Sequence, residues 1–547
     1  MSGRRRLAAI VGLGLVAAAV TLTGAQTPPA TAARPAPSRP RLLVLLVVDQ
    51  FRADYVDWYG GEWTSGLKRL VTDGAFFPRA TVPYGITKTC AGHATIGTGT
   101  WPAVHGLIDN DWYDSRARST VPCTLDEGAR SIGFGGPGIE RHGPARLLAP
   151  TLAEELRRQA STPPRIVAMA LKARAAISLS GRGGPGTIVF WEEDSGLWAT
   201  SSAFASTPWP EVAELIAERP TQSARGQLWN RLLAPNRYRF DDRAPGEPSA
   251  GTFPHVLRTP IGTPFAAVWD MSPLADAYLA ELGASLTSKV GLGQRNTTDL
   301  LAIGFSALDY VGHAYGPRSH EVQDMLIRLD VVLGRMFDAL DASVGKDRYT
   351  VALTSDHGVA LLPEQADLAE GNGRLTLTPL GVAIESALAS HFNRRAFIEA
   401  ITGSYVHFLP GVLDEIRANP AAVRAVQAAA EGAPGVERVF WSWDLSSNAP
   451  TTDPRLSAMR RSYVAGRSGD LAFQPEPNWV VASAGTNHGS WHPYDTTVPL
   501  AFMGAGIKPG RYTSDATLAD VAPTLGATAG VSMPRATGRI LKDVLAD

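Results

Sequence analysis

Three aspartates follow apolar runs that are typical of strands buried on both faces of a parallel sheet. The run RLLVLLVVD ends at Asp49, LLAIGFSALD ends at Asp309 and YTVALTSD ends at Asp356. Ligands of open α/β sheets bind beyond the carboxyl ends of the strands, so we expect these distant carboxylates to converge. One such aspartate would most simply be a turn or cap residue, whereas three of them predict a shared site.

Histidines accompany these aspartates. His313 follows Asp309 by four residues, His357 follows Asp356 directly, and His488 lies downstream in GTNHGSWHPYD. Three carboxylates and three imidazoles are enough ligands for two divalent cations with open positions. Imidazole and carboxylate ligands without thiolate favour zinc. Manganese and cobalt are alternatives, whereas the three histidines argue against magnesium. The sequence therefore predicts a two-metal catalytic site.

A nucleophile is predicted in the segment TKTCAGHATI, residues 87–96. Its polar start and small apolar continuation indicate the beginning of a helix, where free backbone N–H groups stabilise phosphoryl oxygens. We expect the Thr89 hydroxyl there to be bound and ionised by one metal. Cys90 is the rival nucleophile, but it lies one residue further along and points elsewhere. By itself, Thr89 would be interpreted as an N-cap.

The chain has two cysteines, Cys90 and Cys123, which leaves two alternatives open. In an oxidising compartment they could form one disulfide beside Thr89, and otherwise they are two unpaired thiols. Two cysteines cannot build a zinc–thiolate site, so a metal must rely on histidine and carboxylate ligands.

The elements that must position these residues follow an alternating pattern. Between the strand-like runs, residues 319–340 keep apolar side chains at a helical period, so we predict a helix there. Strands alternating with helices indicate a doubly wound α/β sheet. Two stretches without that pattern, about 185–295 and about 360–478, are predicted insertions. The second contains a strand signal at 404–409 and a helix signal at 420–430, typical of a small α+β cap, and the core is expected to resume near Trp479.

The bulk composition is that of a globular protein with a large core. The chain has 547 residues, of which 44% are hydrophobic and 19% charged. The 51 basic and 52 acidic residues give a net charge of -1 without a block of like charge. Sequence-independent binding of nucleic acid therefore has no electrostatic support.

The N-terminus predicts export. Three arginines at positions 4–6 precede an apolar run and then small residues, the order of a secretory signal peptide. We expect a signal at residues 1–25, with cleavage as late as residue 32, and a Pro/Ala-rich tether at 26–40. An uncleaved anchor is the alternative, because the apolar run approaches the ~20 residues that span a bilayer. The expected location is periplasmic or secreted, without a stable membrane anchor after cleavage, and the adjacent arginines permit a twin-arginine route.

Six motifs occur in one order along the chain: LLVVDQFRADYV, KTCAGHATIGTGTWPAVHGLIDNDWYD, LKARAAI, GFSALDYVGHAYGP, TSDHG and TNHGSWHPYDTTVPL. With them the sequence resembles the alkaline phosphatase superfamily, from residue 42 to about 505. It is most similar to the single-chain bacterial branch with a threonine nucleophile, the phosphate-irrepressible alkaline phosphatases, and is related to the nucleotide pyrophosphatase/phosphodiesterases. The resemblance implies a three-layer α/β/α sandwich with a mostly parallel sheet and inserted cap segments, spanning residues 41–547.

The resemblance also implies roles for individual residues. One zinc ion would be held by Asp49, Asp356, His357 and the oxygen of Thr89, and the other by Asp309, His313 and His488. Asn110 in GLIDNDWYD matches the amide that donates to a non-bridging phosphoryl oxygen. Lys172 and Arg174 in ALKARAAI match the basic pair that marks the monoesterase branch.

Charge supports the role of the basic pair. If the segment is extended, Lys172 and Arg174 project from the same face. A phosphate monoester carries about two negative charges near neutral pH, one more than a diester, and two cations would neutralise the excess. We therefore expect hydrolysis of small phosphate monoesters through a phosphothreonine intermediate, with release of inorganic phosphate.

Other activities are weighed against the same residues. A phosphodiesterase or nucleotide pyrophosphatase is the main alternative, because it would share both metals and Thr89. A sulfatase would need Cys or Ser in C/S-x-P-x-R, and neither Pro nor Arg follows Cys90 at the required positions. A non-catalytic metal- or phosphate-binding protein would be expected to have lost a ligand or the nucleophile, and none is missing. The natural substrate and the oligomeric state are not predicted.

Overall fold

The computed structural model describes residues 39–182, 186–192, 195–248, 251–259, 265–367 and 371–546. They belong to one compact unit that begins at Pro37. The predicted signal peptide and nearly all of the predicted tether lie outside the described residues. Within those residues, no helix has both the length and the apolar character needed to cross a bilayer.

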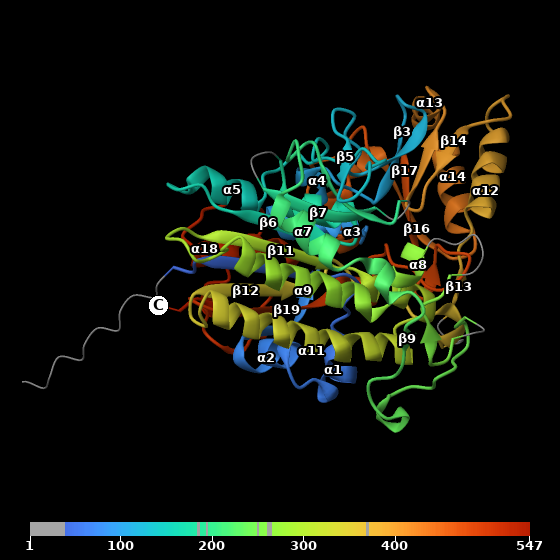
Figure 1. The fold of residues 1–547 in the computed structure, drawn as a ribbon. Coiled ribbons are helices and arrows are strands. Elements are labelled where there is room, and N and C mark those ends of the chain that lie inside the picture. The colour runs from blue at the N-terminus through green and yellow to red at the C-terminus, as the bar shows by residue number, and fades with distance from the viewer. Residues whose placement is uncertain are drawn as a thin grey trace, which may run out of the picture. The chain divides into compact units, whose positions relative to one another are not determined.

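A ten-stranded sheet forms the centre of this unit (Figure 1). Its strands lie in the order β20 (Gly510–Arg511), β2 (Ala75–Thr81), β19 (Thr497–Gly504), β12 (Tyr349–Thr354), β1 (Leu42–Val48), β11 (Asp299–Phe305), β6 (Ile166–Ala170), β7 (Thr187–Glu192), β8 (Leu197–Ser201) and β5 (Ser131–Gly133). The five strands from β12 to β7 are mutually parallel, whereas β19 and β8 run antiparallel to their neighbours. The sheet is therefore mostly parallel, as expected.

Helices cover both faces of the sheet. All seven residues of β1 are fully buried, and they alternate between two apolar clusters, with Val44 in one and Leu45 in the other. The first cluster includes side chains of α1 (Asp54–Tyr59), α2 (Gly66–Asp73), α9 (Pro273–Lys289) and α11 (His320–Ser343). The second includes side chains of α3 (Thr89–Thr98), α5 (Leu152–Gln159), α6 (Ala173–Ser180) and α18 (Val521–Thr528). This confirms the three-layer α/β/α architecture.

The predicted helix at 319–340 is confirmed as α11. The Ser319 hydroxyl caps it by accepting a hydrogen bond from the backbone N–H of Val322. The prediction that Asp309 ends a strand is wrong. Strand β11 ends at Phe305, and Asp309 lies in the first turn of α10 (Ala307–Tyr315). The chain turns helical early because Leu308 and Val311, three residues apart, both pack into the first apolar cluster.

The start predicted for the first insertion, at about residue 185, is wrong. Strands β7 and β8 belong to the central sheet, and α9 packs against β11. Trp191 and Trp198 on these strands are buried in contact with Trp269, so these three tryptophans are part of the hydrophobic core. Between β8 and α9, the described α-helices and strands that lie outside the sheet are α7 (Pro210–Glu218), β9 (Leu228–Trp229), β10 (His255–Val256) and α8 (Phe265–Asp270).

The second insertion forms the expected α+β cap. Its sheet has the order β14 (Ile398–Ile401), β15 (Tyr405–Phe408), β17 (Leu471–Pro475) and β16 (Val436–Trp441). Helices α12 (Leu377–Ala389), α13 (Val412–Ala418) and α14 (Pro420–Glu431) share its apolar cluster. The central sheet resumes at β19 and not near Trp479, because β18 (Trp479–Val480) pairs with β13 (Gly373–Arg374). The remaining α-helices and strands of the described residues are α4 (Pro102–His105), β3 (Asp111–Asp114), β4 (Ser119–Pro122), α15 (Ser442–Leu445), α16 (Pro454–Ser462) and α17 (Pro493–Thr496).

Candidate active site

The carboxyl ends of three neighbouring parallel strands gather the predicted acidic residues. Val48 at the end of β1 is in register with Phe305 of β11, and Val47 with Thr354 of β12. Asp49 follows β1 directly, Asp356 follows β12 by two residues, and α10 starts just after β11. The parallel register therefore brings the three chain segments to one edge of the sheet.

Asp49, Asp356 and His357 form one group of potential metal ligands, the Asp49 group. One ligand atom from each lies within 4.8 Å of the others, and all three side chains are fully buried. His357 Nε2 is 3.5 Å from Asp49 Oδ1 and 3.2 Å from Asp356 Oδ2. Both of these carboxylate oxygens are buried without a hydrogen-bond partner among the described residues. Buried acceptors of this kind fit a cation.

Asp309, His313 and His488 form a second group, the Asp309 group. One ligand atom from each of these residues also lies within 4.8 Å of the others. Asp309 Oδ1 lies 3.2 Å from His313 Nε2 and 3.8 Å from His488 Nε2. The rings of His357 and His488 stack with their centroids 3.5 Å apart, which places the two groups side by side. Six predicted metal-ligating side chains are thus brought together in the two sets that the resemblance implied.

The three histidines in these groups all present the same ring nitrogen to the site. His313 Nδ1 lies 2.8 Å from the carbonyl of Thr486, His488 Nδ1 lies 2.7 Å from that of Thr87, and His357 Nδ1 lies 2.9 Å from that of Gly358. A carbonyl oxygen can only accept, so Nδ1 carries the proton in each ring. A neutral ring then has its lone pair on Nε2, directed at the carboxylates, as in many metal sites.

Lys172 joins the two groups electrostatically. It is the N-cap residue of α6, and its Nζ donates to Asp49 Oδ2 at 2.6 Å and to Asp309 Oδ2 at 2.5 Å. Burial alone would lower the pKa of this ammonium, but the two carboxylates raise it above its ordinary value. Lys172 therefore stays charged and offsets part of the negative charge at this edge.

Burial and neighbouring charges shift the pKa values of Asp49 and Asp309 in opposite directions. Burial, reinforced by Asp309 and Asp356, raises the pKa of Asp49 well above its usual value. Burial opposes ionisation of Asp309 too, yet His313 and Lys172 hold its pKa well below the usual range. Burial lowers the pKa of His357 and, more strongly, that of His488. The neutral rings of His357 and His488 are in the protonation state in which imidazole binds a metal.

Thr89 begins α3 at the edge of this site. It is the first residue of the helix, with Lys88 as N-cap, so the predicted helix start is confirmed. The side chain is 1% exposed, and its Oγ1 lies 3.5 Å from His357 Nε2. The helix packs closely here because Gly92 has no side chain: a Cβ at that position would lie 2.5 Å from Cβ of Asp356. The hydroxyl is therefore held against the Asp49 group.

Asn110, Lys172 and Arg174 line one cavity of about 560 Å³. Oδ1 of Asn110 accepts a hydrogen bond from the backbone N–H of Cys90 at 2.9 Å, which leaves the NH₂ group of the amide available as a donor. The neighbouring Asp109 accepts hydrogen bonds from the Asn110 backbone N–H and the Ser404 hydroxyl.

The extended conformation considered for Lys172 and Arg174 is wrong. Lys172 has extended backbone angles, but α6 begins at Ala173, so Arg174 lies within a helix. Strand β6 ends at Ala170, and the buried alanines at 173, 175 and 176 pack a helix on the sheet at once. The two cations reach the cavity from the start of a helix instead of from one face of a strand.

Two residues outside the predicted set of site residues brace the site. Gln50 is buried in a left-handed conformation, with φ of 69°, and donates from Nε2 to Asp309 Oδ1 at 2.6 Å. His93 is fully buried, with its Nδ1 3.2 Å from Asp356 Oδ2 and 3.0 Å from the carbonyl of Thr89. A glutamine next to a ligand and a histidine one helical turn after Thr89 were the available signals.

Comparison with known proteins gives consistent matches over most of the chain. The family model for type I phosphodiesterase / nucleotide pyrophosphatase matches residues 43–495. Alkaline phosphatase PhoV of Synechococcus elongatus is 29% identical over 523 residues, 93% of each chain. Alkaline phosphatase PafA of Elizabethkingia meningoseptica is 30% identical over 534 residues, 93% of this chain and 95% of PafA. The crystal structure of wild-type PafA matches with a TM-score of 0.84 at 28% identity, covering 93% of this chain and 99% of PafA.

Proposed function

Because the chain belongs to the type I phosphodiesterase/nucleotide pyrophosphatase family, we propose that it is an alkaline phosphatase, a metal-dependent hydrolase of phosphate monoesters with Thr89 as nucleophile. Relatives that it matches over most of their length are named alkaline phosphatases. One observation carries the proposal: the Thr89 hydroxyl lies against one of two adjacent ligand groups, beside a cavity lined by an amide and two cations.

The two ligand groups fit two zinc ions. Each offers carboxylate oxygen and imidazole Nε2, and Asp49 Oδ1, which is buried without a hydrogen-bond partner among the described residues, is suited to a cation. Manganese or cobalt could replace zinc with the same ligands. Two such ions would supply positive charge to the attacking and departing oxygens of the phosphoryl transfer.

The residues of the chain do the rest of the work by positioning and charge. The Thr89 oxygen attacks phosphorus, the ester P–O bond breaks, and the alcohol leaves. Water then hydrolyses the phosphothreonine, which releases inorganic phosphate and restores the hydroxyl. The Asn110 amide donates to a non-bridging oxygen, while Lys172 and Arg174 neutralise the charge of the monoester. Donors fixed before the reaction stabilise the transition state without reorganisation.

Phosphodiesterase activity is the alternative, because the family includes enzymes of that class. A diester carries one negative charge fewer than a monoester, so it would gain less from the two cations. The cavity that brings Lys172 and Arg174 together with Asn110 therefore favours monoesters. The partners are small phosphate monoesters, and the setting is the periplasm or the extracellular space after removal of the signal.

The test compares phenyl phosphate with bis-nitrophenyl phosphate on the metal-loaded protein, together with metal analysis. Thr89→Ala should abolish monoester turnover and keep both metals. Arg174→Ala should reduce monoester turnover by about tenfold or more and leave diester turnover nearly unchanged. A preference for the diester, together with an unaffected Arg174→Ala variant, would assign the protein to the phosphodiesterases. Full turnover by Thr89→Ala would refute the nucleophile.

A further inference from the structure

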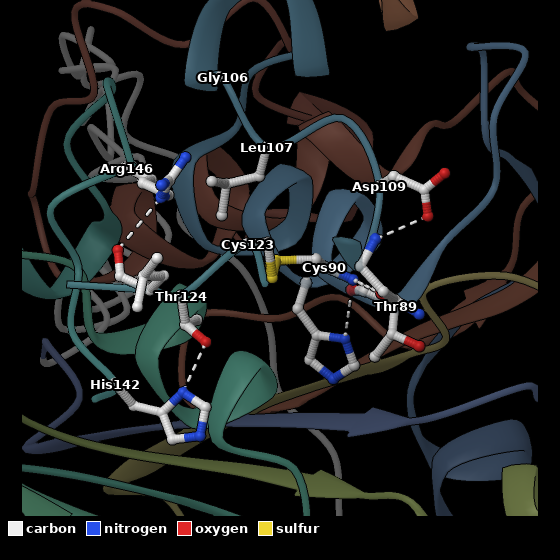
Figure 2. Close-up of a disulfide and its surroundings, with 12 residues drawn as sticks. Thr89, Cys90, Gly106, Leu107, Asp109, Cys123, Thr124, His142 and Arg146 are labelled. Atoms are coloured by element: carbon white, nitrogen blue, oxygen red, sulfur yellow. Dashed lines mark hydrogen bonds between the residues drawn. A yellow bond between two sulfur atoms is a disulfide. The ribbon is translucent and has the colours of Figure 1, made fainter. Parts of the chain in front are cut away.

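The disulfide between Cys90 and Cys123 lies directly beside the proposed nucleophile (Figure 2). Cys90 is the second residue of α3, and Cys123 directly follows β4. Both side chains are buried in an apolar cluster with Leu107, Trp112 and other residues. The two sulfur atoms are bonded to each other and take no part in the reaction proposed above.

The disulfide is the covalent part of a closed set of contacts around Asn110. The backbone N–H of Cys90 donates to Asn110 Oδ1 at 2.9 Å, and the backbone N–H of Cys123 donates to the Asn110 carbonyl at 2.8 Å. Asn110 is thus held by both cysteine residues, once at its side chain and once at its backbone. The bridge fixes the distance between these two holding points.

The hairpin next to Asn110 needs such an anchor. Strands β3 and β4 pair only with each other among the described residues, Asp111 lies opposite Pro122, and Asn110 and Cys123 form the base of the hairpin. A two-stranded hairpin is marginally stable alone. Trp112 and Val121 anchor its inner face in the apolar cluster, but they do not connect it to the start of α3 through a bond. The disulfide cross-links the base of the hairpin directly to the start of α3.

We propose that the Cys90–Cys123 disulfide is a positioning element for catalysis, which holds the amide of Asn110 at a fixed distance from the Thr89 hydroxyl. The inference rests on the proposed function, in which that amide binds a phosphoryl oxygen. Loss of the bridge leaves Thr89 and the metal ligands in place but lets the hairpin base, with Asn110, move relative to α3. Full activity then requires an oxidising compartment, in keeping with the proposed export.

A double-mutant cycle tests this on the metal-loaded protein with phenyl phosphate. The four proteins are wild type, Cys90→Ala/Cys123→Ala, Asn110→Ala and the triple variant. Breaking the bridge should reduce kcat/KM by about tenfold to a hundredfold when Asn110 is present. It should reduce kcat/KM by less than about twofold when Asn110 is already alanine, because residues that act through one another are not additive.

Inorganic phosphate provides a readout that does not depend on turnover. Calorimetry should show weaker phosphate binding after loss of the bridge in wild type and no further weakening in the Asn110→Ala background. Leu147→Ala is the matched control, because it opens a cavity in the same apolar cluster but leaves the bridge intact. It should lower the melting temperature and preserve kcat/KM.

Equal losses with and without Asn110 would overturn the inference, since the bridge would then act through general stability. Undiminished activity without the bridge would overturn it too. If the alanine pair is recovered unfolded, wild type and Asn110→Ala are instead compared after reduction with a phosphine in mild urea, with thiols counted. Failure of the proposed function is distinguishable, because wild type itself would then not hydrolyse phenyl phosphate.

Discussion

The side-chain amide of Gln50 donates from Nε2 to Oδ1 of Asp309 across 2.6 Å, although the two residues are 259 positions apart in sequence. The backbone N–H of Gln50 also donates to Asp356 Oδ1 at 3.2 Å. One residue therefore orients a carboxylate from each ligand group. Hydrogen bonds to metal-ligating carboxylates fix their direction and tune the affinity of the site.

Replacement of Gln50 by alanine should weaken metal binding. Without the amide donor, Oδ1 of Asp309 is oriented less firmly toward His313 and His488, although Lys172 still donates to Oδ2, and we expect a loss of about 10- to 100-fold in affinity. Competition with a chromophoric chelator measures this directly. Gln427→Ala, on the exposed face of α14, is the control. Identical affinities for Gln50→Ala and wild type would show that Gln50 does not orient the ligands.

Removal of the charge on Lys172 should destabilise the metal-free protein more than the metal-loaded protein. Without cations, the ammonium is the group that holds Asp49 and Asp309 together. Breaking a buried ion pair from one side costs on the order of 3–5 kcal/mol, and bound metals would supply much of the missing charge. Calorimetric melting of Lys172→Met with chelator and with zinc measures the two losses. Equal losses under both conditions would contradict this role.

Introduction of a methyl group at Gly92 should displace the nucleophile. The added Cβ would lie 2.6 Å from the carbonyl oxygen of Asp356, so α3 must move away from the Asp49 group. A shift of this kind can reduce turnover by about a hundredfold. We expect Gly92→Ala to fold, to bind metal and to show the loss in kcat. Gly61→Ala, where a Cβ meets no atom within 4 Å, should match wild type. An unchanged kcat for Gly92→Ala would refute the tight fit.

Asp276 on α9 should make stability depend on pH. Burial raises its pKa to about 7, although it accepts a hydrogen bond from the backbone N–H of Ala307 at 3.2 Å. Between its ordinary pKa of 3.8 and about 7, the folded protein keeps a proton that the unfolded chain has lost. The contribution of Asp276 to the unfolding free energy is therefore fully present below pH 3.8, declines as the pH rises and levels off above about pH 7.

Asp276→Asn removes this pH dependence and can still accept from Ala307. We expect a gain in unfolding free energy on the order of 1–4 kcal/mol at pH 8 and a smaller gain at pH 5. Urea unfolding at both pH values measures it. The exposed Asp241→Asn is the control, and its unfolding free energy should differ from that of wild type by the same amount at both pH values. A larger gain at pH 5 than at pH 8 would contradict the assignment.

The sequence by itself predicted three central strands, β1, β11 and β12, the helix α11 and the six side chains that form the two ligand groups. Seven consecutive apolar residues before Asp49 can only be buried on both faces, and parallel strands end at one edge, so the convergence of Asp49, Asp356 and the start of α10 was predictable. The motifs added Asn110, Lys172 and Arg174 as candidates. The location of the signal peptide and the roles of these residues remain predictions.

The tertiary structure alone decided the contacts made by residues that no local pattern distinguishes. Burial of Leu308 and Val311 turned the chain helical before Asp309, and packing of α6 on the sheet placed Arg174 in a helix. The bridge from Cys90 to Cys123 and the hydrogen bond from Gln50 to Asp309 depend on the meeting of distant segments. Periodicity records which side of an element is buried, but not which partner covers it, because partners are chosen by the packing of the whole chain.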